Sequence, residues 1–155
     1  MSPMCTCIVL FFAICFFLFR RCRSYYNPIE MNKNHLIKQV DLLMLRLMNH
    51  EQYGKLSRRW KDGEIVVIHD DVETFTYDNT TIHISLSNSL ERNTMMYVML
   101  HELTHIQLES TDHGPQFIKE FEQLRRFAEE FEIYSEVTKD DTYGGRSIKS
   151  YDEVI

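Results

Sequence analysis

The stretch that decides the fold runs from residue 93 to residue 115. It reads Asn93-Thr-Met-Met-Tyr-Val-Met-Leu-His-Glu-Leu-Thr-His-Ile-Gln-Leu-Glu-Ser-Thr-Asp-His-Gly-Pro115. The unbroken apolar run at residues 95–100, with no glycine or proline, predicts a largely buried helix over residues 93–108. Residues four apart lie one turn above each other on a helix, so His101 and His105 share one face.

The spacing of these two histidines is that of a metal chelate. Imidazoles at positions i and i+4 of a helix can bind one ion, and Glu102 is placed to act as general base on a water at that ion. A catalytic zinc ion takes three protein ligands and leaves one position open. The segment after the helix supplies His113 as the third ligand.

Composition limits the other choices of ligand. All four cysteines lie within the first 22 residues, so a metal site in the remainder must use histidine and carboxylate. Glu109 and Asp112 are the alternatives to His113, or else they are acceptors that orient a ligand imidazole. Charge that follows a buried run needs a partner, and a metal ion is an effective one. We therefore expect bound Zn²⁺.

The segments before this stretch predict one helix and three strands. Apolar residues at spacings of three and four predict a helix over residues 34–56. Runs rich in β-branched and aromatic residues predict strands over residues 64–68, 74–77 and 81–86. Because the runs are too close together for intervening helices, they favour a small antiparallel meander over a parallel sheet.

The segments after it predict one more helix and an irregular tail. Pro115 suits the first turn of an amphipathic helix over residues 115–133, and residues 134–155 are polar and acidic. The fold class is therefore α+β: an N-terminal helix, a small three-stranded sheet, the helix that carries the histidines and a closing helix.

The N-terminus has a different composition. Residues 1–19 carry no charged side chain and are followed by Arg20, Arg21 and Arg23. This length just meets the minimum of about 17 residues for a bilayer span, and a signal peptide would need a basic region before the apolar run. We expect one transmembrane helix with the following domain on the cytosolic side. The expected segments are 1–23 (anchor), 24–33 (linker), 34–150 (metal-binding domain) and 151–155 (tail).

The remainder of the chain is acidic. Removing the three N-terminal arginines from the 17 basic residues leaves 14 against 23 acidic ones, a formal charge of −9. Such a domain repels phosphate backbones unless its cations form a patch. Direct nucleic-acid binding is therefore disfavoured.

The metal motif resembles a known class of enzymes. The pairing of His101-Glu-Leu-Thr-His105 with His113-Gly-Pro-Gln-Phe117 and an amphipathic helix is similar to WLM and SprT-like metallopeptidases, above all to small WLM-like proteins of large DNA viruses. The resemblance covers residues 34–150. It implies a minimal zincin fold, with His101, His105 and His113 as zinc ligands and Glu102 as catalytic base.

The resemblance implies hydrolysis of peptide bonds in a protein substrate. Together with the expected anchor, it predicts a single-pass membrane metallopeptidase acting on the cytosolic or virion-interior side. One alternative is a protease for DNA–protein crosslinks whose hydrophobic leader is not an anchor. Another is a catalytically silent zinc-binding virion membrane or structural protein, although retention of Glu102 argues against it.

Other positions have weaker expectations. Strand 81–86 is the candidate edge strand that would align an extended peptide substrate. Tyr134 and Tyr143 follow the closing helix and are expected to pack. The remaining histidines are expected to be solvated or half-exposed and not to be ligands: His35, His50, His69 and His83.

Overall fold

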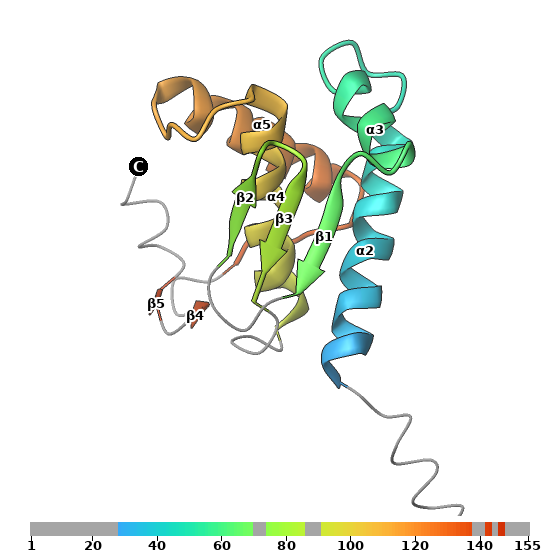
Figure 1. Ribbon diagram of the computed structural model, residues 1–155, viewed down its shortest axis with the longest axis vertical. Helices are drawn as coiled ribbons and strands as arrows, with labels where there is room; N and C mark the ends of the chain where they lie inside the picture. Colours follow the sequence, from blue (N-terminus) through green and yellow to red (C-terminus); the bar gives the residue numbers. More distant parts are fainter. Residues whose placement is uncertain (1–27, 70–73, 86–90, 138–141, 144–145, 148–155) are drawn as a thin grey trace, which may run out of the picture. The chain divides into compact units, whose positions relative to one another are not determined.

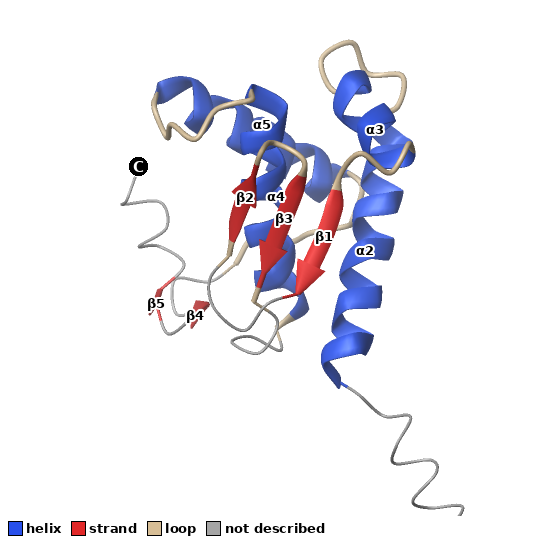
Figure 2. Ribbon diagram, viewed as in Figure 1, coloured by secondary structure: helices blue, strands red, loops and turns tan. Residues whose placement is uncertain are grey.

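The computed structural model describes residues 28–69, 74–85, 91–137, 142–143 and 146–147. The chain divides into two compact units, Met1–Met31 and Asn32–Ile155. The elements are α2 (Pro28–Leu47), α3 (Gly54–Lys61), β1 (Val66–His69), β2 (Phe75–Tyr77), β3 (Thr81–Ile84), α4 (Arg92–Leu108), α5 (Pro115–Glu130), β4 (Thr142–Tyr143) and β5 (Arg146–Ser147) (Figure 1). The predicted α+β class with a small three-stranded sheet is confirmed (Figure 2).

The two helices of the motif region form where the sequence predicts them. Helix α4 is buried continuously from Thr94 to Ile106, which explains its unbroken apolar run. Helix α5 has Pro115 in its first turn, where the missing N–H costs no hydrogen bond. It ends three residues before the predicted 133, because Glu132 adopts a left-handed conformation with φ of 57°.

The single helix predicted over residues 34–56 is wrong, because two helices occupy this region. Helix α2 ends at Leu47, and α3 begins only at Gly54. The apolar stripe lapses over residues 49–52, so the chain has nothing to bury there and turns. Gly54 allows the turn to close, since a Cβ at this position would lie 3.1 Å from the backbone oxygen of Met48.

The predicted antiparallel meander is also wrong. The strand order is β1-β3-β2, with β1 parallel and β2 antiparallel to β3. Within this sheet β2 and β3 form a hairpin, and Asp78 and Asn79 adopt the left-handed conformation at its turn. The connection from β1 to β2 is five residues, enough to cross one strand at a spacing of about 4.8 Å per strand. Residue composition does not distinguish this path from a meander.

The observed strand order places β2, and not β3, at an edge of the sheet. Strand β3 is central, so the prediction that residues 81–86 form the edge strand is wrong, and β2 is the edge strand that packs beside α4. Thr76 pairs with the fully buried Ile82 and so points toward the helices, whereas Phe75 and Tyr77 are exposed on the outer face. One face of the sheet therefore packs on the helices and presents Thr76 to α4.

The C-terminal region is not wholly irregular. Strands β4 and β5 form a short antiparallel pair, with Thr142 opposite Ser147 and Tyr143 opposite Arg146. The prediction of an irregular tail over residues 134–155 is corrected to that extent.

The membrane prediction falls on other residues. Within the described part of the chain, no helix combines the length and the apolar character needed to cross a bilayer. The predicted anchor, residues 1–23, lies outside the described residues.

We expect the core contact of α2 to be measurable in a matched pair of variants. Leu43 is fully buried and Leu45, on the same helix, is 61% exposed. Leu43→Ala should lower the free energy of unfolding by about 2–5 kcal/mol, because it leaves a cavity. Leu45→Ala should change it by about 0.5 kcal/mol or less. Chemical denaturation of both variants checks this, and equal losses would contradict the packing of α2.

Candidate metal centre

Three histidines converge on one point. His101 and His105 come from adjacent turns of α4 and are each 8% exposed, and His113 is half-buried in the segment before α5. The Nε2 atom of His101 lies 3.2 Å from Nε2 of His105 and 3.1 Å from Nε2 of His113. One ring nitrogen from each residue lies within 4.8 Å of the others, so the three side chains are close enough to bind a metal ion.

The separations fit tetrahedral coordination. Two nitrogens that each lie about 2.05 Å from a tetrahedral zinc are about 3.3 Å apart. The two observed Nε2 separations, 3.1 and 3.2 Å, are only slightly shorter. The set is neutral imidazole without thiolate, which zinc and other late first-row metals accept.

The turn after α4 brings His113 back to the other two histidines. Glu109 caps the helix in a left-handed conformation, with φ of 52°, and so reverses the chain without a glycine. The next residue, Ser110, accepts a 2.9 Å hydrogen bond through its carbonyl from Nδ1 of His105. Because a carbonyl only accepts, Nδ1 carries the proton and Nε2 keeps its lone pair for a metal.

Phe117 packs against all three imidazoles. Its ring centroid lies 4.8 Å from that of His101, 4.6 Å from that of His105 and 4.7 Å from that of His113. Phe117 is 1% exposed and stands in the first turn of α5. Helix α5 fixes the position of Phe117. The phenyl ring therefore limits the orientations of the three imidazole rings that pack on it.

The two alternative carboxylate ligands are not in the cluster. Glu109 is exposed and forms an ion pair of 2.8 Å with Lys55, which lowers the pKa of Glu109 chiefly by hydrogen bonding. Asp112 is also exposed, and its backbone N–H bonds to the Ser110 hydroxyl. The group of metal-binding geometry consists of His101, His105 and His113.

Burial keeps the histidine cluster uncharged. It lowers the pKa of His101 to about 3, with further lowering from the neighbouring His105 and His113. Burial is also the main cause that lowers the pKa of His105 and of His113. All three imidazoles are therefore neutral near neutral pH, as metal coordination requires.

Glu102 follows His101 on α4 and is buried. Burial raises its pKa to about 7, against the opposing effect of a hydrogen bond from Thr76. The Thr76 hydroxyl donates to the Glu102 carboxylate at 2.6 Å. A carboxyl with a pKa near neutral can both accept and return a proton, which is the property of a general acid–base.

The sequence reasoning missed three contributors to the site: Thr76, Ser110 and Phe117. Thr76 reaches Glu102 across 26 residues of sequence, and only the pairing register shows that it points inward. Ser110 acts through its carbonyl, which any residue carries. A contact of Phe117 with the site could have been predicted, because Phe117 lies in the first turn of the helix that follows His113.

The tyrosines and other histidines lie elsewhere. Tyr134 is buried against Tyr97, and its hydroxyl accepts a bond from the N–H of Val137. Tyr143 lies in β4. His83 stacks on Phe75 on the outer face of the sheet. The remaining histidines are placed as follows: His50 packs on Tyr53 and Phe127, His35 is half-buried on α2, and His69 ends β1.

Comparison with protein-family models, with curated proteins and with solved structures found no match.

Thr76 gives a prediction about pH dependence. Thr76→Val removes the hydrogen bond that holds the pKa of Glu102 down, so this pKa rises and the carboxyl is ionised only at higher pH. We expect the acid limb of any Glu102-dependent hydrolysis to move to higher pH, with activity at mildly acidic pH reduced roughly tenfold. Thr76→Ser keeps the hydroxyl and should restore the profile. Identical kcat/KM profiles for the valine and serine variants would show that Thr76 has no influence on the base.

Proposed function

We propose that this chain is a zinc-dependent metallopeptidase with a minimal zincin fold of the WLM and SprT-like type. The observation that carries the proposal is the juxtaposition of the three-histidine cluster with Glu102, a buried carboxyl whose pKa is raised to about 7. A purely structural metal site needs no such group. Structural zinc is also usually held by four protein ligands, whereas this cluster offers three.

We propose zinc because of the type and the number of the ligands. Three neutral imidazoles and an open fourth position are typical of catalytic zinc. The hydrogen bond from His105 to the Ser110 carbonyl orients the ring as outer partners do in such sites. Zinc bound there would polarise a scissile carbonyl and lower the pKa of an attacking water.

The protein's own groups carry the proton transfers. Glu102 would accept the proton of the attacking water at its carboxylate and then donate it to the leaving amine. Thr76 would hold that carboxylate in place through the 2.6 Å hydrogen bond. Because α4 is buried on all sides at this level, bulk water has little access to the base.

The edge strand β2 is the proposed place for the substrate backbone. Among the described strands it pairs only with β3, so its other edge is open to an extended peptide. Thr76, its middle residue, touches Glu102, so a peptide paired along this edge would run past the base. The substrate class is therefore an extended or unfolded segment of a protein.

The location rests on the sequence. We propose that residues 1–23 tether the domain to a membrane, so that the substrate is a protein near that membrane. The acidic charge of the remainder, −9, favours this over a crosslink protease that must approach DNA.

Metal-dependent proteolysis tests the proposal. Full-length protein in detergent should cut an unfolded substrate such as reduced, carboxymethylated lactalbumin after loading with zinc. Chelation should stop the cleavage, and added zinc should restore it, because the ion is required in each turnover. Fragments that form equally fast after complete metal removal would rule out a metallopeptidase.

A further inference from the structure

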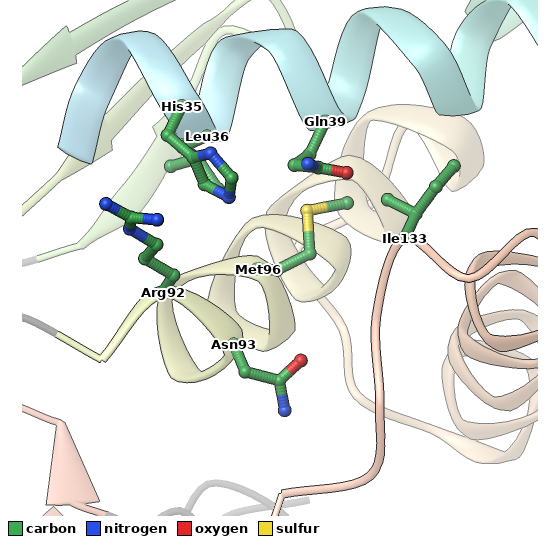
Figure 3. Close-up of a pocket in the computed structure, with 7 residues that line it drawn as sticks. All are labelled: His35, Leu36, Gln39, Arg92, Asn93, Met96 and Ile133. Carbon is green, nitrogen blue, oxygen red and sulfur yellow. The ribbon is translucent and has the colours of Figure 1, made fainter. Parts of the chain in front are cut away.

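A polar hollow lies away from the histidine cluster, at the other end of α4. It has a volume of about 190 Å³ and is bounded by α2, by the start of α4 and by the segment after α5 (Figure 3). Arg92, at the beginning of α4, precedes His101 by nine residues, or about 13 Å of helix axis. The hollow is therefore a site separate from the proposed peptidase centre.

The lining has one polar end and one apolar wall. His35 of α2 and Arg92 of α4 face each other at one end, and the amide of Gln39 lies further along α2 (Figure 3). The apolar wall is made of Leu36, Met96 and Ile133, which are 2%, 2% and 8% exposed. A ligand that fits both parts has a polar group joined to a short apolar or carbon-rich portion.

The polar end favours an anion. None of the lining residues is acidic, although the chain beyond Arg23 carries a net charge of −9. Among the described residues, Arg92 has no ion-pair partner. The charges of Arg92 and Lys38 both lower the pKa of His35, after burial as the main cause, so both cations lie near its imidazole. A guanidinium with free donors is suited to phosphate, which it can bind with two parallel hydrogen bonds.

The wall opposite α2 is held in place by Asn93. Its side-chain amide donates to the carbonyl of Ser135 and its oxygen accepts the Ser135 N–H at 2.9 Å. These two bonds tie the segment after α5 to the first turn of α4 and so keep Ile133 against the hollow. The site is therefore preformed, which lowers the entropic cost of binding.

We propose that this hollow binds the phosphate group of a small phosphate ester, with Arg92 and His35 on the phosphate and Leu36, Met96 and Ile133 against the ester's carbon portion. The volume is several times a water's share of about 30 Å³ and smaller than the roughly 300 Å³ of a drug-sized pocket. It therefore suits a group of the size of glycerol phosphate. Such a group occurs both in soluble esters and in phospholipid headgroups.

Calorimetric titration of full-length, metal-loaded protein in detergent tests this proposal. The probes are sn-glycerol 3-phosphate and the short-chain lipid dihexanoyl phosphatidic acid, with dihexanoyl phosphatidylcholine as the zwitterionic comparison. We expect saturable binding of a phosphate monoester and roughly tenfold weaker binding in Arg92→Gln. Gln39→Glu adds a negative charge at nearly constant size and should abolish binding. Arg46→Gln, in the last turn of α2, is the control and should bind as the wild type does.

Each result decides the proposal. Binding of glycerol phosphate as tight as that of the lipid assigns a soluble ester, and binding of phosphatidic acid alone assigns a lipid headgroup. If Arg92→Gln does not fold, as judged by circular dichroism and metal content, Gln39→Glu carries the test. No saturable binding of either monoester, or binding unaffected by the substitutions that fold, would overturn it.

Discussion

Glu102→Gln is expected to reduce peptide hydrolysis by about 10²–10⁴-fold, the usual contribution of a general acid–base. Glutamine has almost the same shape but cannot accept the proton of the attacking water. It can still accept a hydrogen bond from Thr76 through its amide oxygen, so the local packing is preserved. The loss should appear in kcat, with little change in KM, because the group acts on the reacting atoms.

Two controls make this result specific. The metal content of Glu102→Gln should equal that of the wild type, since Glu102 is not part of the three-histidine cluster. Glu109→Gln, which removes an exposed ion-pair partner of Lys55 and Arg59, should keep full activity. Wild-type rates in a metal-loaded Glu102→Gln protein would remove Glu102 from the mechanism.

Metal removal is expected to lower the stability of the folded protein strongly. An ion that binds only the folded state stabilises it by about 4 kcal/mol when its free concentration is a thousandfold above Kd. For a folded unit of this size, that corresponds to roughly 10–20 °C in Tm. The reason is that the cluster joins α4, the segment before α5 and, through Phe117, α5 itself. Calorimetric scans with and without chelator measure the difference, and equal Tm values would contradict a bound ion in the folded protein.

The metal-free protein should also become less stable in acid. The pKa of His101 is about 3 in the folded protein, below its ordinary value of 6.5. The unfolded chain therefore takes up a proton as the pH falls below 6.5, and the folded chain does not until about 3. Stability is complete above this window and declines as the pH falls through it. His101→Asn should weaken the dependence in denaturation curves of the metal-free protein.

The histidine cluster was predictable because its geometry is local. His101 and His105 are held by helical periodicity, and only seven residues join His105 to His113, so few arrangements keep the third ring far away. The buried character of α4 was equally readable, because a continuous apolar run permits no exposed face. In both cases short-range rules are sufficient.

The strand order and the partner of Glu102 were not predictable, because they depend on long-range pairing. The sequences of the three strands β1, β2 and β3 are compatible with either β2 or β3 in the centre of the sheet. The inward position of Thr76 follows only from its pairing with Ile82. The free edge and the hydrogen bond to Glu102 therefore emerge only with the register of the sheet.

The end of α4 at Leu108 agrees with the prediction, but the backbone conformation that ends it was not predicted. The chain leaves α4 at Glu109 in a left-handed conformation that non-glycine residues seldom adopt. Its side chain forms an exposed ion pair with Lys55 of α3. Sequence patterns seldom predict a left-handed residue of this kind, because residue type alone does not favour it.

Zinc content per chain tests the central claim most directly. Mass spectrometry should compare full-length wild type with His113→Ala and with His83→Ala, which removes a histidine outside the cluster. We expect about one zinc per chain in the wild type and in His83→Ala, and almost none in His113→Ala, because two imidazoles bind far more weakly than three. A wild-type protein without metal, or zinc retained in full by His113→Ala, would contradict the three-histidine centre and the peptidase built on it.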